Sequence, residues 1–90
     1  MGVTVNLYGN LRVVMGQSEM KLDWTGGTLR EMIDRMAVQY GKTIAEELFD
    51  EDGELDRAYA LFIKGEQVDD LSIRIEDGDE VVVTSMLAGG

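Results

Sequence analysis

The segment from Thr28 to Tyr40 constrains the fold of this chain more than any other. Its apolar side chains recur at intervals of three and four residues, which places them on one stripe of an α-helix. The stripe consists of Leu29, Met32, Ile33, Met36, Ala37 and Tyr40. Thr28 and Glu31 have the spacing of a capping box, and Gly41 suits the position after a helix end. Because such a helix must bury its stripe, the rest of the chain has to supply one matching apolar face.

Segments in which apolar and polar residues alternate flank this helix on both sides and indicate strands. The predicted strands are Val3–Tyr8, Glu19–Trp24, Ala58–Lys64, a short segment at Val68, and Glu80–Met86. Residues 9–18 are expected to form a connection that turns the first two strands into an antiparallel pair. Residues Thr43–Phe49 predict a second, short helix, because Thr43 and Glu46 repeat the capping-box spacing.

The order of these elements predicts an α+β fold. A right-handed crossover through the helix would place the first and last strands parallel at the centre of the sheet. The apolar Val81–Val83 run agrees with a central position, where a strand has neighbours on both sides. We therefore expect a β-grasp (ubiquitin-like) domain over residues 1–86: a mixed sheet of four to five strands with one main helix packed on one face. Residues 87–90 would form a flexible C-terminal tail.

Composition excludes several classes of function. The 90 residues include no cysteine and no histidine, so thiol nucleophiles, thiolate zinc sites and histidine-based catalysis are ruled out. The 8 basic and 18 acidic residues give a net charge of −10, which argues against nucleic acid as a partner. No apolar run is long enough to cross a membrane, and the N-terminus lacks the features of a signal peptide. The expected location is the cytoplasm.

Two local patterns resemble binding motifs but do not meet their requirements. Gly41-Lys42-Thr43 matches the end of a phosphate-binding loop, yet Met36 stands where that loop needs its first glycine. The acidic residues from Asp50 to Asp56 resemble part of a calcium loop, but Gly53 is misplaced and Leu61 occupies the position of the bidentate glutamate. We expect neither a metal site nor a bound cofactor.

The chain ends in Leu87-Ala88-Gly89-Gly90, and this ending points to chemistry at Gly90. Glycine has no side chain to pack and loses the most backbone entropy when it is ordered, so a terminal Gly-Gly contributes little to a fold. Ala88 has only a methyl group and the glycines have no side chain, so the tail could thread into the active site of another protein, with Leu87, Ala88 and Gly89 as the threading residues. The carboxylate of Gly90 then becomes the candidate reacting group, once it has been activated, for example as an acyl-adenylate.

With these features together, the whole chain resembles the ubiquitin-like sulfur carriers. That family includes the small subunit of molybdopterin synthase, the sulfur carriers of thiamine and cysteine biosynthesis, and the small archaeal ubiquitin-like modifiers. The resemblance is carried by the strand at Val3, the capped helix from Thr28, the Asp52-Gly53-Glu54-Leu55 turn, the Asp77-Gly78-Asp79-Glu80-Val81 turn and strand, and the Ala88-Gly89-Gly90 ending. The last two are the most specific.

The resemblance implies a carrier or co-substrate rather than an independent enzyme. An activating enzyme of the ubiquitin-activating type would adenylate Gly90 with ATP, and a sulfur-donor protein would convert it to a thiocarboxylate. The carrier would then deliver sulfide to an acceptor enzyme, such as the large subunit of molybdopterin synthase or another enzyme of biosynthesis. In that first case the chain would be the small subunit of the sulfur-transfer enzyme.

A partner-docking surface is expected on the sheet face that the helix leaves open. Tyr59, Leu61, Ile63, Val81 and Val83 should point into the core. The alternate positions Phe62, Val82, Thr84 and Met86 should then form an exposed patch close to the tail.

Two alternatives stay open at this point. The chain could be a protein modifier joined through Gly90 to lysines of target proteins, since this use needs the same activation step. It could also be a passive β-grasp interaction module whose Gly-Gly ending has no role.

Overall fold

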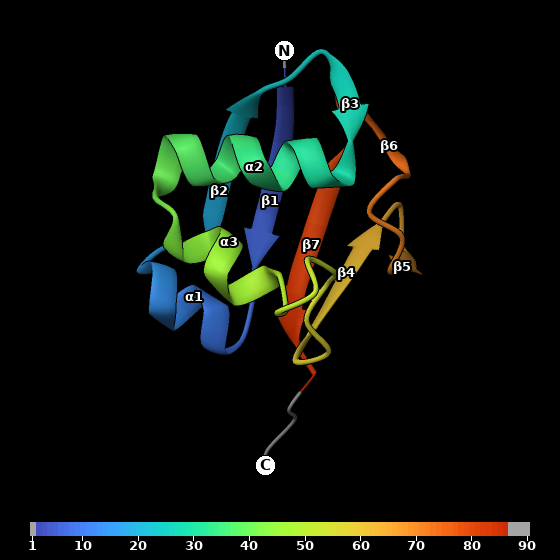
Figure 1. Ribbon diagram of the computed structural model, residues 1–90. Coiled ribbons are helices and arrows are strands. Elements are labelled where there is room, and N and C mark those ends of the chain that lie inside the picture. Colours follow the sequence, from blue (N-terminus) through green and yellow to red (C-terminus); the bar gives the residue numbers. More distant parts are fainter. Residues whose placement is uncertain (1, 87–90) are drawn as a thin grey trace.

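A mixed β-sheet forms one layer of the molecule, and the helices form the other (Figure 1). The computed structural model describes residues 2–86. Within this range the sheet contains β1 (Gly2–Leu7), β2 (Glu19–Asp23), β4 (Tyr59–Ile63), β5 (Glu66–Val68) and β7 (Glu80–Ser85). Their spatial order is β2-β1-β7-β4-β5. Strands β1 and β7 are parallel, and all other neighbours are antiparallel. The predicted β-grasp arrangement, with its first and last strands side by side, is confirmed.

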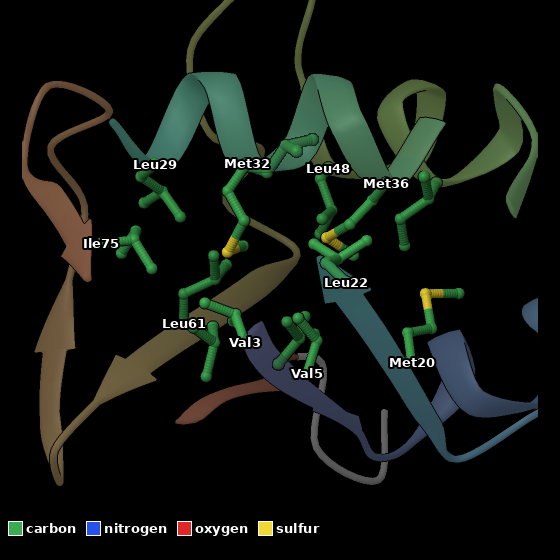
Figure 2. Packing of buried hydrophobic residues seen from close by; sticks show 14 of the residues in the cluster. Val3, Val5, Met20, Leu22, Leu29, Met32, Met36, Leu48, Leu61 and Ile75 are labelled. Atoms are coloured by element: carbon green, nitrogen blue, oxygen red, sulfur yellow. The ribbon is translucent and has the colours of Figure 1, made fainter. Parts of the chain in front are cut away.

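Helix α2 (Leu29–Tyr40) lies across the sheet and supplies most of the helical side of the core. Leu29, Met32, Ile33 and Met36 are fully buried. Figure 2 shows Met32 and Met36 reaching down toward side chains of the sheet such as Val3, Leu22 and Leu61. The predicted apolar stripe is therefore the face that packs on the sheet, as expected for an amphipathic helix.

The predicted capping box at the start of α2 is present in full. The backbone N–H of Glu31 donates to the Thr28 hydroxyl at 3.2 Å, and the Thr28 N–H donates to the Glu31 carboxylate at 2.8 Å. Two N–H groups of the first turn region thus gain acceptors. At the other end, the N–H of Gly41 donates to the carbonyl of Ala37. Both predicted ends of this helix are confirmed.

The connection at residues 9–18 contains a helix that the sequence did not indicate. Helix α1 (Asn10–Met15) begins after Gly9 and ends at Gly16, which adopts the left-handed conformation with φ 72°. Leu11 is fully buried and fixes the helix to the core. The helix closes the end of the molecule at which β7 finishes (Figure 1).

Helix α3 (Thr43–Leu48) confirms the short second helix and its start at Thr43 but corrects its cap. The residue that caps it is Lys42 rather than Thr43, and no side chain makes a cap hydrogen bond. The expected capping box of Thr43 and Glu46 is therefore wrong. The helix is held by packing instead, because its apolar residues Ile44 and Leu48 are fully buried.

A second, small sheet joins the start of α2 to the region before β7. Strands β3 (Gly26–Thr28) and β6 (Arg74–Glu76) pair antiparallel, where the sequence had indicated only a break between β2 and the helix. The indole N–H of buried Trp24 donates to the carbonyl of Ile75 at 2.8 Å. This hydrogen bond ties the end of β2 to the small sheet.

The outer edge of β2 is closed by side chains of α2. The backbone N–H of Lys21 donates to the Tyr40 hydroxyl at 3.0 Å, and the same hydroxyl donates to the Lys21 carbonyl at 3.0 Å. The Gln39 amide also donates to this carbonyl at 2.9 Å. Free N–H and C=O groups on an edge strand invite pairing with another chain. At Lys21, Tyr40 occupies the place that a neighbouring strand would take.

Candidate functional site

Strand β7 carries the chain to the predicted reactive end. Its last residue is Ser85, and the N–H of the following residue, Met86, donates to the carbonyl of Ala58 at 2.7 Å. Met86 is therefore still hydrogen-bonded to the segment that leads into β4. We call Ser85 and Met86 the tail root. The predicted reacting residue Gly90 and the predicted threading residues Leu87, Ala88 and Gly89 lie outside the described residues.

The tail root is supported from both sides. A side chain at Gly9 would meet the Cβ of Ser85 at 3.1 Å, so the turn before α1 packs closely against it. On the other side, Tyr59 of β4 pairs with Ser85, and its hydroxyl donates to the carboxylate of Glu47 on α3 at 2.5 Å. The end of β7 is thus set between α1 and β4.

Tyr59 corrects one detail of the predicted core. Leu61, Ile63, Val81 and Val83 are buried as expected, but Tyr59 is only half-buried, because its hydroxyl reaches the Glu47 carboxylate on α3. Partial burial and this hydrogen bond raise the pKa of the Tyr59 hydroxyl above its ordinary value.

The open face of the sheet carries the four residues predicted for docking. Phe62 and Val82 lie directly opposite each other on β4 and β7, and both are half-buried. Thr84 lies one step nearer the tail root, opposite Ala60, and Met86 is about half exposed at 51%. The structure therefore brings Phe62 and Val82 into direct contact distance as a cross-strand pair and leaves Thr84 and Met86 between that pair and the tail.

A shallow hollow of about 460 Å³ opens beside Phe62 and Val82. Its rim is charged, because it includes Lys64, Asp79 and Glu80. The Lys64 ammonium lies 3.7 Å from the Asp79 carboxylate. An apolar floor with a charged rim is the usual composition of a protein interface.

Sequence reasoning missed the rim of this hollow. Asp79 had been interpreted as a turn residue, and it does accept a hydrogen bond from the N–H of Glu76 at 2.8 Å within that turn. Asp79 also forms an ion pair with Lys64. That contact depends on the register of β4 and β7, which brings the ends of the two strands together. That register depends on strand pairing and is not visible in either segment alone.

Residues 2–86 hold no grouping of three or more acidic side chains with the geometry of a metal site. None of the described helices has the length and apolar character needed to span a membrane.

Comparison with known proteins places this geometry in a family. The family model described as the ThiS family matches residues 5–90. The chain belongs to the ThiS family. Its resemblance to the ubiquitin-like sulfur carriers is thereby confirmed, and members of this family are small carrier proteins. Among curated proteins, no sequence matches the chain.

Solved structures of ubiquitin-like proteins share the fold over nearly the whole chain. SAMP1 of Haloferax volcanii, the small archaeal modifier protein 1, matches with a TM-score of 0.84 at 23% identity and covers 100% of both chains. CysO of Mycobacterium tuberculosis matches with a TM-score of 0.75 at 30% identity, over 92% of this chain and 97% of its own.

A third similar structure contains a partner protein. It is the BexX/CysO complex of Amycolatopsis orientalis, which matches with a TM-score of 0.76 at 25% identity, over 98% of this chain and 99% of the other.

Proposed function

We propose that this ThiS family member is a sulfur carrier that works through Gly90. The observation that carries the proposal is the family match, which extends through Gly89 and Gly90 to residue 90. The described chain supports it, because the central strand β7 leads directly to the tail root. A strand held on both sides gives a slender tail a fixed starting point.

The chemistry begins with activation of a poor electrophile. A carboxylate oxygen of Gly90 attacks the α-phosphorus of ATP on an activating enzyme of the ubiquitin-activating type, and pyrophosphate leaves. The acyl-adenylate has AMP as a good leaving group. A hydrosulfide equivalent from a sulfur-donor protein then attacks the acyl carbon and displaces AMP, which yields the thiocarboxylate. This product donates sulfide in biosynthesis of a molybdopterin-type cofactor or a related compound.

The open face of the sheet supplies the docking surface in this proposal. Phe62 and Val82 offer the apolar centre, and Thr84 and Met86 extend it to the tail root. A partner that covers this patch would hold the tail in a constant direction. Positioning of this kind lowers the entropic cost of bringing the carboxylate to the activating site.

Mass spectrometry of the intact chain tests the proposal. The purified chain is incubated with ATP, its activating enzyme and a sulfur donor, and we expect a mass gain equal to the replacement of one oxygen atom by sulfur, located on Gly90. A variant with one alanine added after Gly90 is the matched control, since it keeps the folded domain but moves the carboxylate out of place. Sulfur incorporation that persists in this control would contradict the proposal.

Two further experiments separate the alternatives. After tryptic digestion, the peptide of residues 75–90 joined through Gly90 to lysines of other proteins, without thiocarboxylate, would support the protein-modifier function, since Arg74 is the last basic residue of the chain. Deletion of Gly89 and Gly90 without any loss of function in the cell would support a passive interaction module.

A further inference from the structure

The two edges of the sheet differ in how they are closed. Tyr40 and Gln39 saturate the outward backbone groups of β2 at Lys21. At the other edge, β5 pairs with only the second half of β4, from Leu61 to Ile63. Within residues 2–86, no strand pairs with Tyr59 on that side. Because Met86 pairs with Ala58, the alternation of an antiparallel ladder points the backbone of Tyr59 away from β7 and toward this gap.

A groove of about 420 Å³ lies at this gap, beyond the end of β5. We call it the edge groove. Its apolar wall comes from Leu55, Tyr59, Val68 and Met86. Met86 belongs to the tail root, so the groove begins where the predicted tail leaves the sheet. Leu55 and Val68 are half-buried, and Met86 is half exposed, which leaves apolar surface accessible beside Tyr59. The N–H of Tyr59 donates to the carbonyl of Asp56 at 3.1 Å, so the Tyr59 carbonyl is the backbone group that a partner segment could pair with there.

The charges around the edge groove are unequal. Glu54, Asp56 and Asp69 are acidic, and Arg57 is the one basic residue among the groove's lining residues, so three negative charges and one positive charge leave a net charge of −2. Asp56 accepts a hydrogen bond from the N–H of Ala58 and has a local role in the turn. The ion pairs found among the described residues involve other carboxylates, at Glu19, Glu76 and Asp79. The groove therefore favours a cationic ligand.

We propose that the edge groove binds a short extended segment of a partner protein in which apolar and basic side chains alternate. The segment adds to the Tyr59 end of β4 as a strand, and its N–H donates to the Tyr59 carbonyl. Its apolar side chains contact Val68 and Leu55, and its basic side chains face Glu54 and Asp69. This mode of recognition is β-strand addition, here through the Tyr59 carbonyl at the end of the sheet edge. The inference rests on the proposed function in one respect: it assigns the segment to a protein whose active site receives the predicted C-terminal tail.

The probe for this test is a capped synthetic pentapeptide of alternating valine and lysine. It is titrated into the ¹⁵N-labelled full chain at low salt, without ATP or any enzyme, so its result is separate from that of the sulfur-transfer experiment. We expect shift changes at the amides of Tyr59, Val68 and Met86, with weak affinity for so short a peptide. Raising the salt concentration should weaken binding, since the charges are exposed. A peptide with a central proline should bind poorly, because proline cannot donate to a strand.

Charge variants test the groove with effects of opposite sign. The double variant Glu54→Gln and Asp69→Asn should bind the peptide about fourfold more weakly, which corresponds to about a factor of two for each surface charge. Arg57→Gln should bind it about twofold more tightly for the same reason. The matched control is the double variant Asp34→Asn and Asp77→Asn. It makes the same change in net charge at exposed positions outside the groove and should leave the affinity unchanged.

Three results would overturn the inference. The first is an equal loss of affinity in the control and groove variants, which would mean that the peptide responds only to overall charge. The second is a set of shift changes confined to Phe62 and Val82, which would place the peptide on the open face. The third is full binding by the proline peptide, which would exclude strand pairing.

Discussion

Replacing Gly27 with alanine should destabilise the domain by a mechanism that the structure specifies. Gly27 lies in β3 with φ 153°, a conformation that residues with a side chain rarely adopt. An added Cβ would lie 2.9 Å from the ring of Trp24 and 2.9 Å from a carboxylate oxygen of Glu31. The substitution therefore disturbs a buried ring and the capping box of α2 at once.

The expected loss has two parts. Backbone strain at such a position costs about 1–3 kcal/mol, and overpacking against a buried side chain costs about 1–3 kcal/mol. The two ranges sum to about 2–6 kcal/mol, and we expect a total of about 3–4 kcal/mol. For a domain of this size each kcal/mol lowers the midpoint of thermal unfolding by about 4–8 °C, so the shift should exceed about 12 °C.

Urea unfolding followed by tryptophan fluorescence measures this loss, because Trp24 is the single tryptophan of the chain and lies beside the substitution. Gly16→Ala is the matched control. Gly16 also has a positive φ, of 72°, but nothing lies within 4 Å of the added Cβ, so only backbone strain remains, at about 1 kcal/mol. A loss in Gly27→Ala no larger than in Gly16→Ala would refute the argument from packing.

Three further predictions concern the open face, the closed edge and the helix cap. Phe62→Asp should weaken binding of the activating enzyme by about tenfold while the circular dichroism spectrum stays unchanged, and unaltered affinity would remove Phe62 from the docking surface. Tyr40→Phe should lower the free energy of unfolding by about 1 kcal/mol and cause concentration-dependent association in sedimentation velocity. The reason is that the N–H and carbonyl of Lys21 lose the hydroxyl with which they pair. A strictly monomeric variant would contradict this role. Hydrogen bonds from Thr28 hold the pKa of Glu31 below its ordinary value of 4.5, so the native chain should be more stable than Glu31→Gln above about pH 4.5 and lose this advantage as the pH falls. Urea midpoints at neutral pH and at about pH 3 measure the difference, and an advantage that persists in acid would count against the charged cap.

The sequence predicts the main helix and the central strands because their patterns are local and long enough to read. In α2 the stripe from Leu29 to Tyr40 spans three turns, and in β7 the Val81–Val83 run indicates a strand with two neighbours. Both elements bury most of the side chains that the patterns selected, while Ala37, Tyr40 and Val82 are half-buried. The parallel pairing of β1 and β7 then follows from the right-handed crossover.

The missed elements are short and depend on tertiary contacts. Helix α1 has six residues, too few to display a period, and it is held by one buried side chain, Leu11. Strand β3 begins with Gly26 and Gly27, which have low strand propensity, and it forms because β6 pairs with it. Its pairing partner lies far away in sequence, at Arg74–Glu76.

The candidate site also has one part that the sequence predicts and one part that depends on tertiary contacts. Phe62, Val82, Thr84 and Met86 were predicted from alternation alone and share the open face as expected. The edge groove could not be predicted, because it exists where β5 stops short of Tyr59. The sequence of β4 does not reveal how many of its residues β5 will pair with. Docking on either surface stays a prediction.

The closure of β2 by α2 also bears on the order in which the chain is made. The β1–β2 hairpin leaves the ribosome before the residues that protect it, since Gln39 and Tyr40 follow Lys21 by some twenty positions in the sequence. Until α2 is synthesised and docked, the hairpin carries an open edge on a growing chain, and transiently unpaired strand edges promote misassembly. The end of α2 therefore marks the point in synthesis at which the β2 edge of the hairpin can be closed, whereas the β1 edge stays unpaired until β7 is made.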